Sequence, residues 1–259
     1  MAVHKAPAQQ PVVDPELFLA LYEKMLRAYY VEEQCRLFVR AGKCSFYASA
    51  RGHEKVQIAM AMLLERGKDW FFPYYREKAL MIGLGMPLDQ VFQGMLSRQG
   101  DPNSLGRNMS EHFSSRELRV VSPTACTGTE FLIAVGMAKA VKAEGRDEIV
   151  YVSGGEGSTS EGEYFEALNK AQHDRLPVLF VTARRSVERA LAGADEQPAL
   201  FLDVVGPQHL FVEGEVEFGV DDRLLRGRLV DRHLRPPHGE SILQLRSIKR
   251  HTKPARDPA

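Results

Sequence analysis

The sequence predicts an α/β fold in which helices cover a mostly parallel sheet. Residues 148–153 and 177–181 are short runs rich in β-branched and aromatic residues, and an apolar pattern of helical period lies between them. Two strands joined through a helix form a β-α-β unit, with parallel strands and a right-handed crossover. At 259 residues and 44% apolar composition, the chain can bury a good core in one large domain or two small ones.

The turn after the first of these strands is the most informative stretch of the chain. Residues 154–157, Gly-Gly-Glu-Gly, break the strand and let the backbone approach a ligand closely. Ser160 and Glu163 have the spacing of a capping box, which predicts the start of the following helix. Because free N–H groups and a helix N-terminus meet at this turn, it is suited to bind a phosphate.

Glu156 lies in this turn, where a carboxylate would repel a phosphate. A magnesium ion between them removes the conflict, since Mg²⁺ is commonly held by one or two carboxylates together with phosphate oxygens. The alternative is that Glu156 is a solvated acid in a surface turn. A dinucleotide site is not indicated, because Gly155, Gly157 and Gly162 lack the G-x-G-x-x-G spacing.

Composition excludes several classes of protein. The formal net charge is zero, so nothing indicates nucleic-acid binding. Cys35, Cys44 and Cys126 match neither a CxxC metal site nor a disulfide framework and are expected to be reduced thiols. No signal peptide is evident, and no apolar run reaches the roughly 18 residues that a membrane span needs. We therefore expect a cytoplasmic protein with no nucleic-acid or membrane partner.

The remaining elements are mostly helical. Residues 1–13 are rich in Ala, Pro and Gln and are expected to form a flexible arm. Helices are predicted over 15–40, with Asp14 as N-cap, and over 52–65, after a loop at 46–51. Further helical patterns cover 77–97, with a break at 85–87, and 130–144; the polar stretch 100–115 between them is loop-like and contains His112.

The stretch DWFFPYYR, residues 69–76, is unusually dense in aromatic residues. One reading is a core aromatic cluster beside a surface arginine. The other is an arginine fork for phosphate, with a neighbouring tyrosine as the wall of a pocket. The local pattern alone leaves both readings open.

Four stretches occur in an order that carries a family resemblance. They are SFYASARGHEKVQIAMAML (45–63), DWFFPYYREKALMIGLGMPL (69–88), DPNSLGRNMSEHFSS (101–115) and GEGSTSEGEYFEALN (155–169). Together they resemble the alpha subunit of the thiamine-diphosphate-dependent decarboxylating component of 2-oxo acid dehydrogenase complexes, in particular the branched-chain 2-oxoisovalerate type. The resemblance runs from about residue 17 to 181. It implies a three-layer thiamine-diphosphate-binding fold that is incomplete at the C-terminus.

The resemblance implies a role for each matching residue. Arg76 matches a contact to a diphosphate oxygen, Glu156 matches the acid that coordinates Mg²⁺, and His112 is the implied catalytic residue. Ala125 stands where a serine is common in relatives. The implied cofactor contacts are Tyr74, Tyr75, Arg76, Pro123, Thr124, Ala125, Gly155, Glu156, Gly157, Ser158 and Thr159, and the implied substrate contacts are Phe46, Tyr75, Met109, Ser110, Glu111 and His112.

The resemblance also implies a reaction and partners. Members decarboxylate a 2-oxo acid and pass the acyl group to a lipoyl acyltransferase component, with the thiazolium ring as the electron sink. A separate beta-type subunit supplies the pyrimidine half of the site, in a heterotetramer. The chain is therefore expected to form half of an active site that binds thiamine diphosphate and Mg²⁺.

After Val181 the resemblance ends. Relatives continue into an Asn-Asn-x-Tyr-type loop that completes the Mg²⁺ shell, whereas this chain has Arg185 and Val187 at those positions. A guanidinium group has no lone pair to give, and a valine side chain has no donor atom. Composition changes here too, since residues 1–181 contain 12 Arg and 9 Lys whereas 182–259 contain 11 Arg and 2 Lys.

Three explanations of residues 182–259 stay open. A frameshift replaced the genuine C-terminal half; or the segment is a divergent domain of a non-catalytic or regulatory homologue; or Arg184 and Arg185 bind the diphosphate in place of the metal. We expect a diphosphate-binding domain over 14–181 and a divergent or frameshifted tail with strand-like runs at 199–205, 209–220 and 241–248. The alternative to an active subunit is thus an impaired homologue that retains part of the cofactor site.

Overall fold

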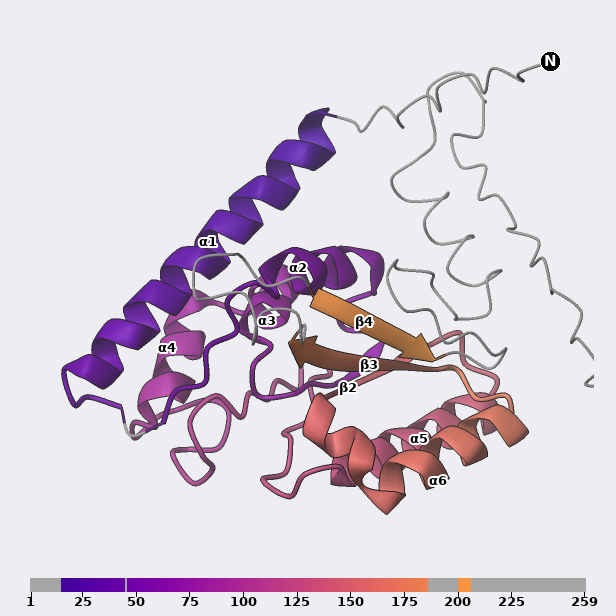
Figure 1. Ribbon diagram of the computed structural model, residues 1–259. Coiled ribbons are helices and arrows are strands. Elements are labelled where there is room, and N and C mark those ends of the chain that lie inside the picture. The colour runs from indigo at the N-terminus through magenta and orange to yellow at the C-terminus, as the bar shows by residue number, and fades with distance from the viewer. Residues whose placement is uncertain (1–14, 45, 186–199, 206–259) are drawn as a thin grey trace, which may run out of the picture.

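A four-stranded sheet lies between two layers of helices (Figure 1). The strands follow the order β1 (Trp70–Phe72), β2 (Val150–Gly155), β3 (Val178–Arg185) and β4 (Leu200–Val205). The first three are parallel, and β4 pairs with β3 in the antiparallel direction. The computed structural model describes residues 15–44, 46–185 and 200–205. The predicted α/β fold with a mostly parallel sheet is confirmed.

Each face of the sheet buries its own set of helices. The first set, above and to the left of the strands in Figure 1, contains α1 (Pro15–Arg40), α2 (Glu54–Leu63), α3 (Lys78–Leu84) and α4 (Leu88–Leu96). The second set, on the opposite face, contains α5 (Thr129–Ala143) and α6 (Gly162–His173). Because successive side chains of a strand point to opposite faces, Tyr151 packs with the first set, and Val150 and Val152 pack with the second.

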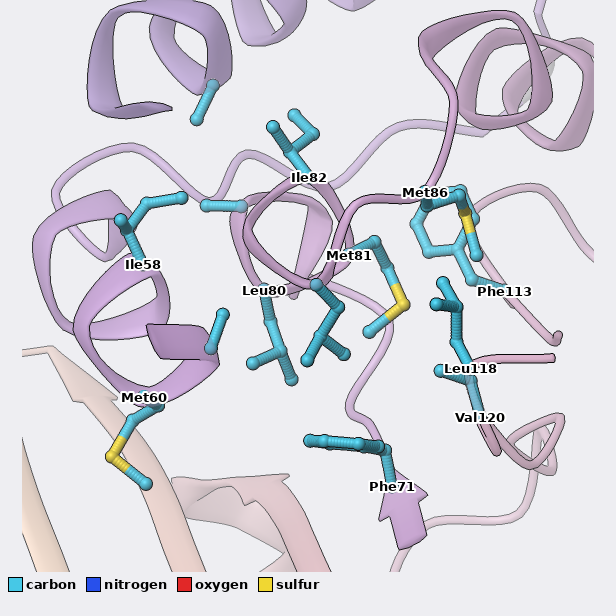
Figure 2. Close-up of a cluster of buried hydrophobic side chains, with 14 of the residues drawn as sticks. Ile58, Met60, Phe71, Leu80, Met81, Ile82, Met86, Phe113, Leu118 and Val120 are labelled. Carbon is cyan, nitrogen blue, oxygen red and sulfur yellow. The ribbon is translucent and has the colours of Figure 1, made fainter. Parts of the chain in front are cut away.

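The larger core lies around α3, whose seven residues are all buried. In Figure 2, Leu80, Met81 and Ile82 of this helix occupy the centre of the cluster. A fully buried side chain of this kind stabilises the fold by roughly 1.5–3 kcal/mol. The side chains around them come from α2, β1 and the chain between α3 and α5, and those labelled in the figure are Ile58, Met60, Phe71, Met86, Phe113, Leu118 and Val120.

The predicted helices are present with small shifts at their ends. The helix over 15–40 is confirmed as α1. The helix predicted over 52–65 is shorter, since Gly52 has φ +89° before α2 and Leu64 is extended after it. The break predicted at 85–87 is confirmed, with Gly85 at φ +92° ending α3 in the left-handed conformation that glycine adopts readily.

Two local predictions were wrong. Ser160 and Glu163 do not form a capping box, because a 3₁₀ turn, η1 (Glu156–Ser160), comes first; α6 then begins at Gly162, with no side-chain cap bond. The aromatic stretch after Asp69 was not predicted to contain a strand, yet Trp70–Phe72 forms β1 and pairs with β2. Three apolar residues in a row carry no alternation, so the pattern could not reveal this strand.

The tail predictions are only partly covered. β3 continues beyond Val181 to Arg185, and β4 lies within the strand-like run predicted at 199–205. The runs at 209–220 and 241–248, like Asp14 and the arm at 1–13, lie outside the described residues. The division of the chain at residue 181 stays a prediction. Within the described ranges, no helix combines the length and apolarity needed to cross a membrane.

Candidate functional site

A cavity of about 460 Å³ opens where β1 and β2 end. The segment that follows β1, the last residues of β2 and the turn η1 all reach it. Ligands of open parallel sheets typically bind at the carboxyl ends of the strands, so the cavity occupies the expected place. It is lined by thirteen of the predicted site residues: Phe46, Tyr74, Tyr75, Arg76, Met109, His112, Pro123, Thr124, Ala125, Gly155, Glu156, Gly157 and Ser158.

Three predicted site residues are not among those that line the cavity. Thr159 lies in η1, where its hydroxyl donates to the Glu156 carbonyl oxygen at 2.7 Å. Ser110 is buried, with its hydroxyl 3.2 Å from that of Ser97. Glu111 is fully buried, and its carboxylate contacts the Lys78 ammonium. Ser110 and Glu111 therefore lie behind the cavity wall.

The glycine turn of residues 154–157 begins later than predicted, because Gly154 and Gly155 do not break the strand but are the last two residues of β2. A side chain at either position would meet neighbouring atoms. A Cβ atom at Gly154 would lie 2.6 Å from Phe131 Cζ and would also meet the Ser158 hydroxyl. At Gly155 it would lie 2.9 Å from the Tyr74 hydroxyl oxygen. At Gly157 nothing lies within 4 Å, so the backbone there faces open space. The turn is thus fixed on one side and accessible on the other.

Arg76 brings a cation to the same cavity. Its guanidinium lies over the rings of Tyr74 and Tyr75, 5.2 and 5.5 Å from their centroids, and Nη2 donates to the Tyr75 hydroxyl at 3.5 Å. Burial opposes the charge, but the two tyrosines raise the pKa of Arg76. The buried Nε–H has no hydrogen-bond partner in the part of the chain that the structure describes. A guanidinium with an unused donor suits a phosphate oxygen.

A buried carboxylate fixes the segment after β1 against β2. The Tyr74 N–H donates to Ser153 Oγ at 2.8 Å, and Ser153 Oγ donates to Glu77 at 2.7 Å. The Tyr151 hydroxyl donates to the second oxygen of Glu77 at 2.6 Å. Burial raises the pKa of Glu77 to about 7, although both hydroxyls lower it. The position of Tyr74 and Arg76 over the turn therefore depends on this network.

Aromatic rings form the wall at the other end of the cavity. The Tyr75 ring contacts that of Phe46 edge to face, with 5.8 Å between the ring centroids. It stacks on the His112 ring with 6.1 Å between the centroids. His112 is 5% exposed, and its Nδ1 lies 3.1 Å from the Ser110 carbonyl oxygen. Because a carbonyl oxygen only accepts, Nδ1 carries the hydrogen in this contact. Nε2 is then the ring nitrogen left for a ligand.

The residues present fit the diphosphate of the implied cofactor better than they fit its metal. Glu156 is exposed. The described residues contain no group of three or more His, Cys, Asp or Glu side chains that could hold a metal ion. Arg185 belongs to β3 but offers no oxygen ligand from its side chain, and Val187 lies outside the described ranges.

The structure adds cavity residues that sequence reasoning missed. Glu130 lies in the first turn of α5, and its Oε1 accepts from both the N–H and the hydroxyl of Thr124 at 2.9 Å. It thereby fixes the predicted segment 123–125 against the cavity. An acid at the start of a predicted helix was the available signal. The other added residues are Pro73, Cys126, Thr127, Gly128, Phe131, Ser153 and Gly154.

Comparison with known proteins agrees with this geometry. Residues 22–184 match the family model described as "Dehydrogenase E1 component". The chain is 35% identical over 161 residues to "2-oxoisovalerate dehydrogenase subunit alpha" of Bacillus subtilis (strain 168), which covers 62% of this chain and 49% of the relative. The chain is 32% identical over 169 residues to "2-oxoisovalerate dehydrogenase subunit alpha 2, mitochondrial" of Arabidopsis thaliana. This match covers 65% of this chain and 35% of the relative.

A relative named for another substrate also matches. The chain is 27% identical over 175 residues to "Pyruvate dehydrogenase E1 component subunit alpha" of Staphylococcus aureus (strain Mu50), covering 66% of this chain and 43% of the relative. The chain thus spans half or less of the length of these curated relatives. The matched region contains all the elements that line the cavity.

Proposed function

The chain belongs to the dehydrogenase E1 component family, and we propose that it is the alpha-type subunit of a 2-oxo acid dehydrogenase that acts on a branched-chain 2-oxo acid. The observation that carries this proposal is the shared cavity. Arg76 and the glycine turn at 154–157 are about 80 positions apart in the sequence, yet they line one site. This is the arrangement that a diphosphate needs.

The diphosphate end of thiamine diphosphate would be held by Arg76 and by the turn. Gly155, Gly157 and Ser158 supply backbone close to the ligand, and Glu156 would face a Mg²⁺ ion. When bound, the cofactor supplies an electron sink for the carbanion left by decarboxylation. Thr159, which does not line the cavity, would support the turn through the Glu156 carbonyl.

The aromatic wall would receive the substrate. Phe46, Tyr75 and Met109 line this side of the cavity and would contact the acyl group. His112 would act as the catalytic residue of this chain. Since Nδ1 is occupied by the Ser110 carbonyl, Nε2 is the atom that would bind the substrate or move a proton.

The partners follow from the same proposal. The relatives are named as alpha subunits, which supports a beta-type subunit that completes the site in a heterotetramer, with a lipoyl acyltransferase component as the acyl acceptor. The free thiols of Cys35, Cys44 and Cys126 support a cytoplasmic location. The experiment is co-expression with a beta-type subunit. We expect co-purification, and a chain that never associates with such a subunit would contradict the assignment.

We further propose that this chain is catalytically impaired because its metal shell is incomplete. Mg²⁺ requires near-octahedral oxygen coordination, and Arg185 and Val187 stand where further ligands are expected. An assay of the co-purified complex with an artificial electron acceptor tests this proposal. We expect no turnover of a 2-oxo acid; reduction of the acceptor would refute the impairment while supporting the family function.

The origin of residues 182–259 has its own test. A frameshift, a divergent domain and a metal-free site held by Arg184 and Arg185 stay the three candidates. Reading the nucleotide sequence downstream of codon 181 in the other two frames separates the first from the others. An Asn-Asn-x-Tyr-type loop in another frame would establish the frameshift, and its absence would leave the divergent domain and the metal-free site.

A further inference from the structure

Three buried charged side chains meet directly behind the aromatic wall of the cavity. They are Glu32 of α1, Lys78 of α3 and Glu111 of the loop at 100–115, and each side chain is at most 2% exposed. Lys78 Nζ lies 3.0 Å from Glu32 Oε1 and 2.5 Å from Glu111 Oε1. Burying ions is costly, and a hydrophobic replacement is often as stable, so core stability alone does not explain the cluster.

Two members of the cluster form hydrogen bonds with the backbone of the wall. The Ala48 N–H donates to Glu111 Oε2 at 2.9 Å, and Lys78 Nζ donates to the Ala48 carbonyl oxygen at 3.1 Å. Both polar groups of this one peptide residue are therefore bound by the ion pair. Ala48 lies two positions after Phe46, whose ring contacts Tyr75 in the cavity.

The two residues of the ion pair are also close in sequence to other residues of the wall. Glu111 directly precedes His112, and Lys78 lies two residues after Arg76. Glu111 has φ +68°, a conformation that non-glycine residues rarely adopt and that persists when surrounding contacts hold it. The carboxylate that contacts Lys78 and Ala48 supplies those contacts.

Glu32 differs from Glu111 in what it holds. Its Oε2 accepts from the Tyr47 hydroxyl at 2.7 Å, and its Oε1 faces Lys78. Within the described residues, the Glu32 carboxylate forms no hydrogen bond with the backbone of the wall. The two glutamates thus share burial and an ion-pair partner, but only Glu111 holds Ala48.

We propose that Glu111 and Lys78 are positioning residues that fix Phe46 and His112 against Tyr75 and so set the shape of the substrate end of the cavity. The effect on a 2-oxo acid rests on the proposed function, whereas the effect on the wall does not. Glu111 acts in this arrangement through Ala48 and His112 and touches no ligand.

The test compares Glu111→Gln with Glu32→Gln in the full-length, ligand-free chain. Both variants remove one carboxylate charge from the same cluster, so Glu32→Gln is a matched control. Hydrogen exchange by mass spectrometry follows the segments 46–51 and 109–112. We expect at least about tenfold faster exchange in both segments for Glu111→Gln and less than about twofold for Glu32→Gln, because local opening free energies follow local contacts.

A second readout follows His112 itself. Modification by diethyl pyrocarbonate should accelerate at His112 in Glu111→Gln, relative to the exposed His173, and should stay slow at the buried His53. Equal effects of the two variants, or no change in either, would overturn the proposal. Because no cofactor is added, these results do not depend on whether thiamine diphosphate binds.

If Glu111→Gln unfolds the whole chain, the proposal is tested on the unsubstituted protein instead. Exchange at the single amide of Ala48 can be resolved by fragmentation of the peptide in the gas phase. We expect protection of at least about 100-fold relative to an unstructured peptide, since this N–H donates to a buried carboxylate. Exchange near the unstructured rate would overturn the proposal.

Discussion

Arginines lie at both ends of the parallel strands, and the two ends use them differently. At the amino end, Arg119 and Arg146 contact Glu148 at 2.8 and 2.6 Å, and the Trp70 indole N–H donates to the same carboxylate at 2.9 Å. At the carboxyl end, Arg76 packs on tyrosines and keeps an unused Nε–H within the described structure. Charges that neutralise each other hold the sheet together, whereas Arg76 remains available for an anion.

The carboxylates at the two ends differ in the same sense. Burial opposes ionisation at Glu148, but Arg119, Trp70 and Arg146 outweigh it and lower its pKa. Glu77, at the cavity end, is fully buried, and its carboxylate accepts from the Tyr151 and Ser153 hydroxyls; burial raises its pKa to about 7. The amino end is thus a network of paired opposite charges, whereas the carboxyl end buries a carboxylate without a paired cation among the described residues.

The largest expected effect concerns the pH dependence of stability. Because the pKa of Glu77 is raised above its value of 4.5 in the unfolded chain, its contribution is fully present below pH 4.5 and is lost as the pH rises to about 7. The loss is about 3 kcal/mol, from 1.36 kcal/mol for each pKa unit. Denaturant unfolding measures the free energy of unfolding of wild type and Glu77→Gln across this pH range. The difference between the two free energies should change by about 3 kcal/mol.

Glu148 contributes a pH dependence of stability of the opposite sign, and Glu148→Gln tests it. Its lowered pKa means that the stabilisation is present above the unfolded value and is lost as the pH falls. Glu148→Gln should therefore lower the stability near pH 7 by a constant amount and flatten the dependence of stability on pH on the acid side. Identical profiles for the two variants would mean that the two ends of the sheet do not differ as described.

The next effect concerns anion binding. Arg76→Met should weaken binding of thiamine diphosphate or inorganic pyrophosphate by about tenfold to a hundredfold, since a charge-assisted hydrogen bond contributes roughly 1.5–3 kcal/mol. Arg119→Met is the control at the other end and should leave this binding unchanged. Titration calorimetry measures both, and an equal loss in the two variants would contradict a specific role for Arg76.

The smallest effect concerns the glycine turn. Gly155→Ala should destabilise the fold by about 1–3 kcal/mol, because the new Cβ would meet the Tyr74 hydroxyl oxygen at 2.9 Å. Gly157→Ala should change stability by less than about 0.5 kcal/mol, because nothing lies within 4 Å of its Cβ. Thermal unfolding of the two variants checks the difference, and equal shifts would show that the turn is not fixed by Tyr74.

The sequence predicted those features that local patterns encode. Helical period and the glycine break gave α1, α3 and α4, and the run 148–153 gave the core of β2. Strand β1 was missed because its three residues have no alternation and depend on pairing with β2, about 80 positions away. Ser160 failed as a cap because the preceding 3₁₀ turn moved the helix start to Gly162.

The predicted site residues show the same limit, since some of them line the cavity and others do not. The motif order placed Tyr75, Arg76 and the glycine turn together, and the cavity contains them all. Glu111 was assigned to the substrate pocket from its loop, but its direction is set by φ +68° and by an ion pair with Lys78, 33 positions away. Spacing along one loop contains neither piece of information.

The most direct test of the cofactor site is a calorimetric titration of the full-length chain with thiamine diphosphate, with Mg²⁺ and again with a chelator. We expect weak binding that depends on Arg76 and changes little between the two conditions. Micromolar binding that disappears with the chelator would contradict the incomplete metal shell. Binding that is unaffected by Arg76→Met would contradict the diphosphate site itself.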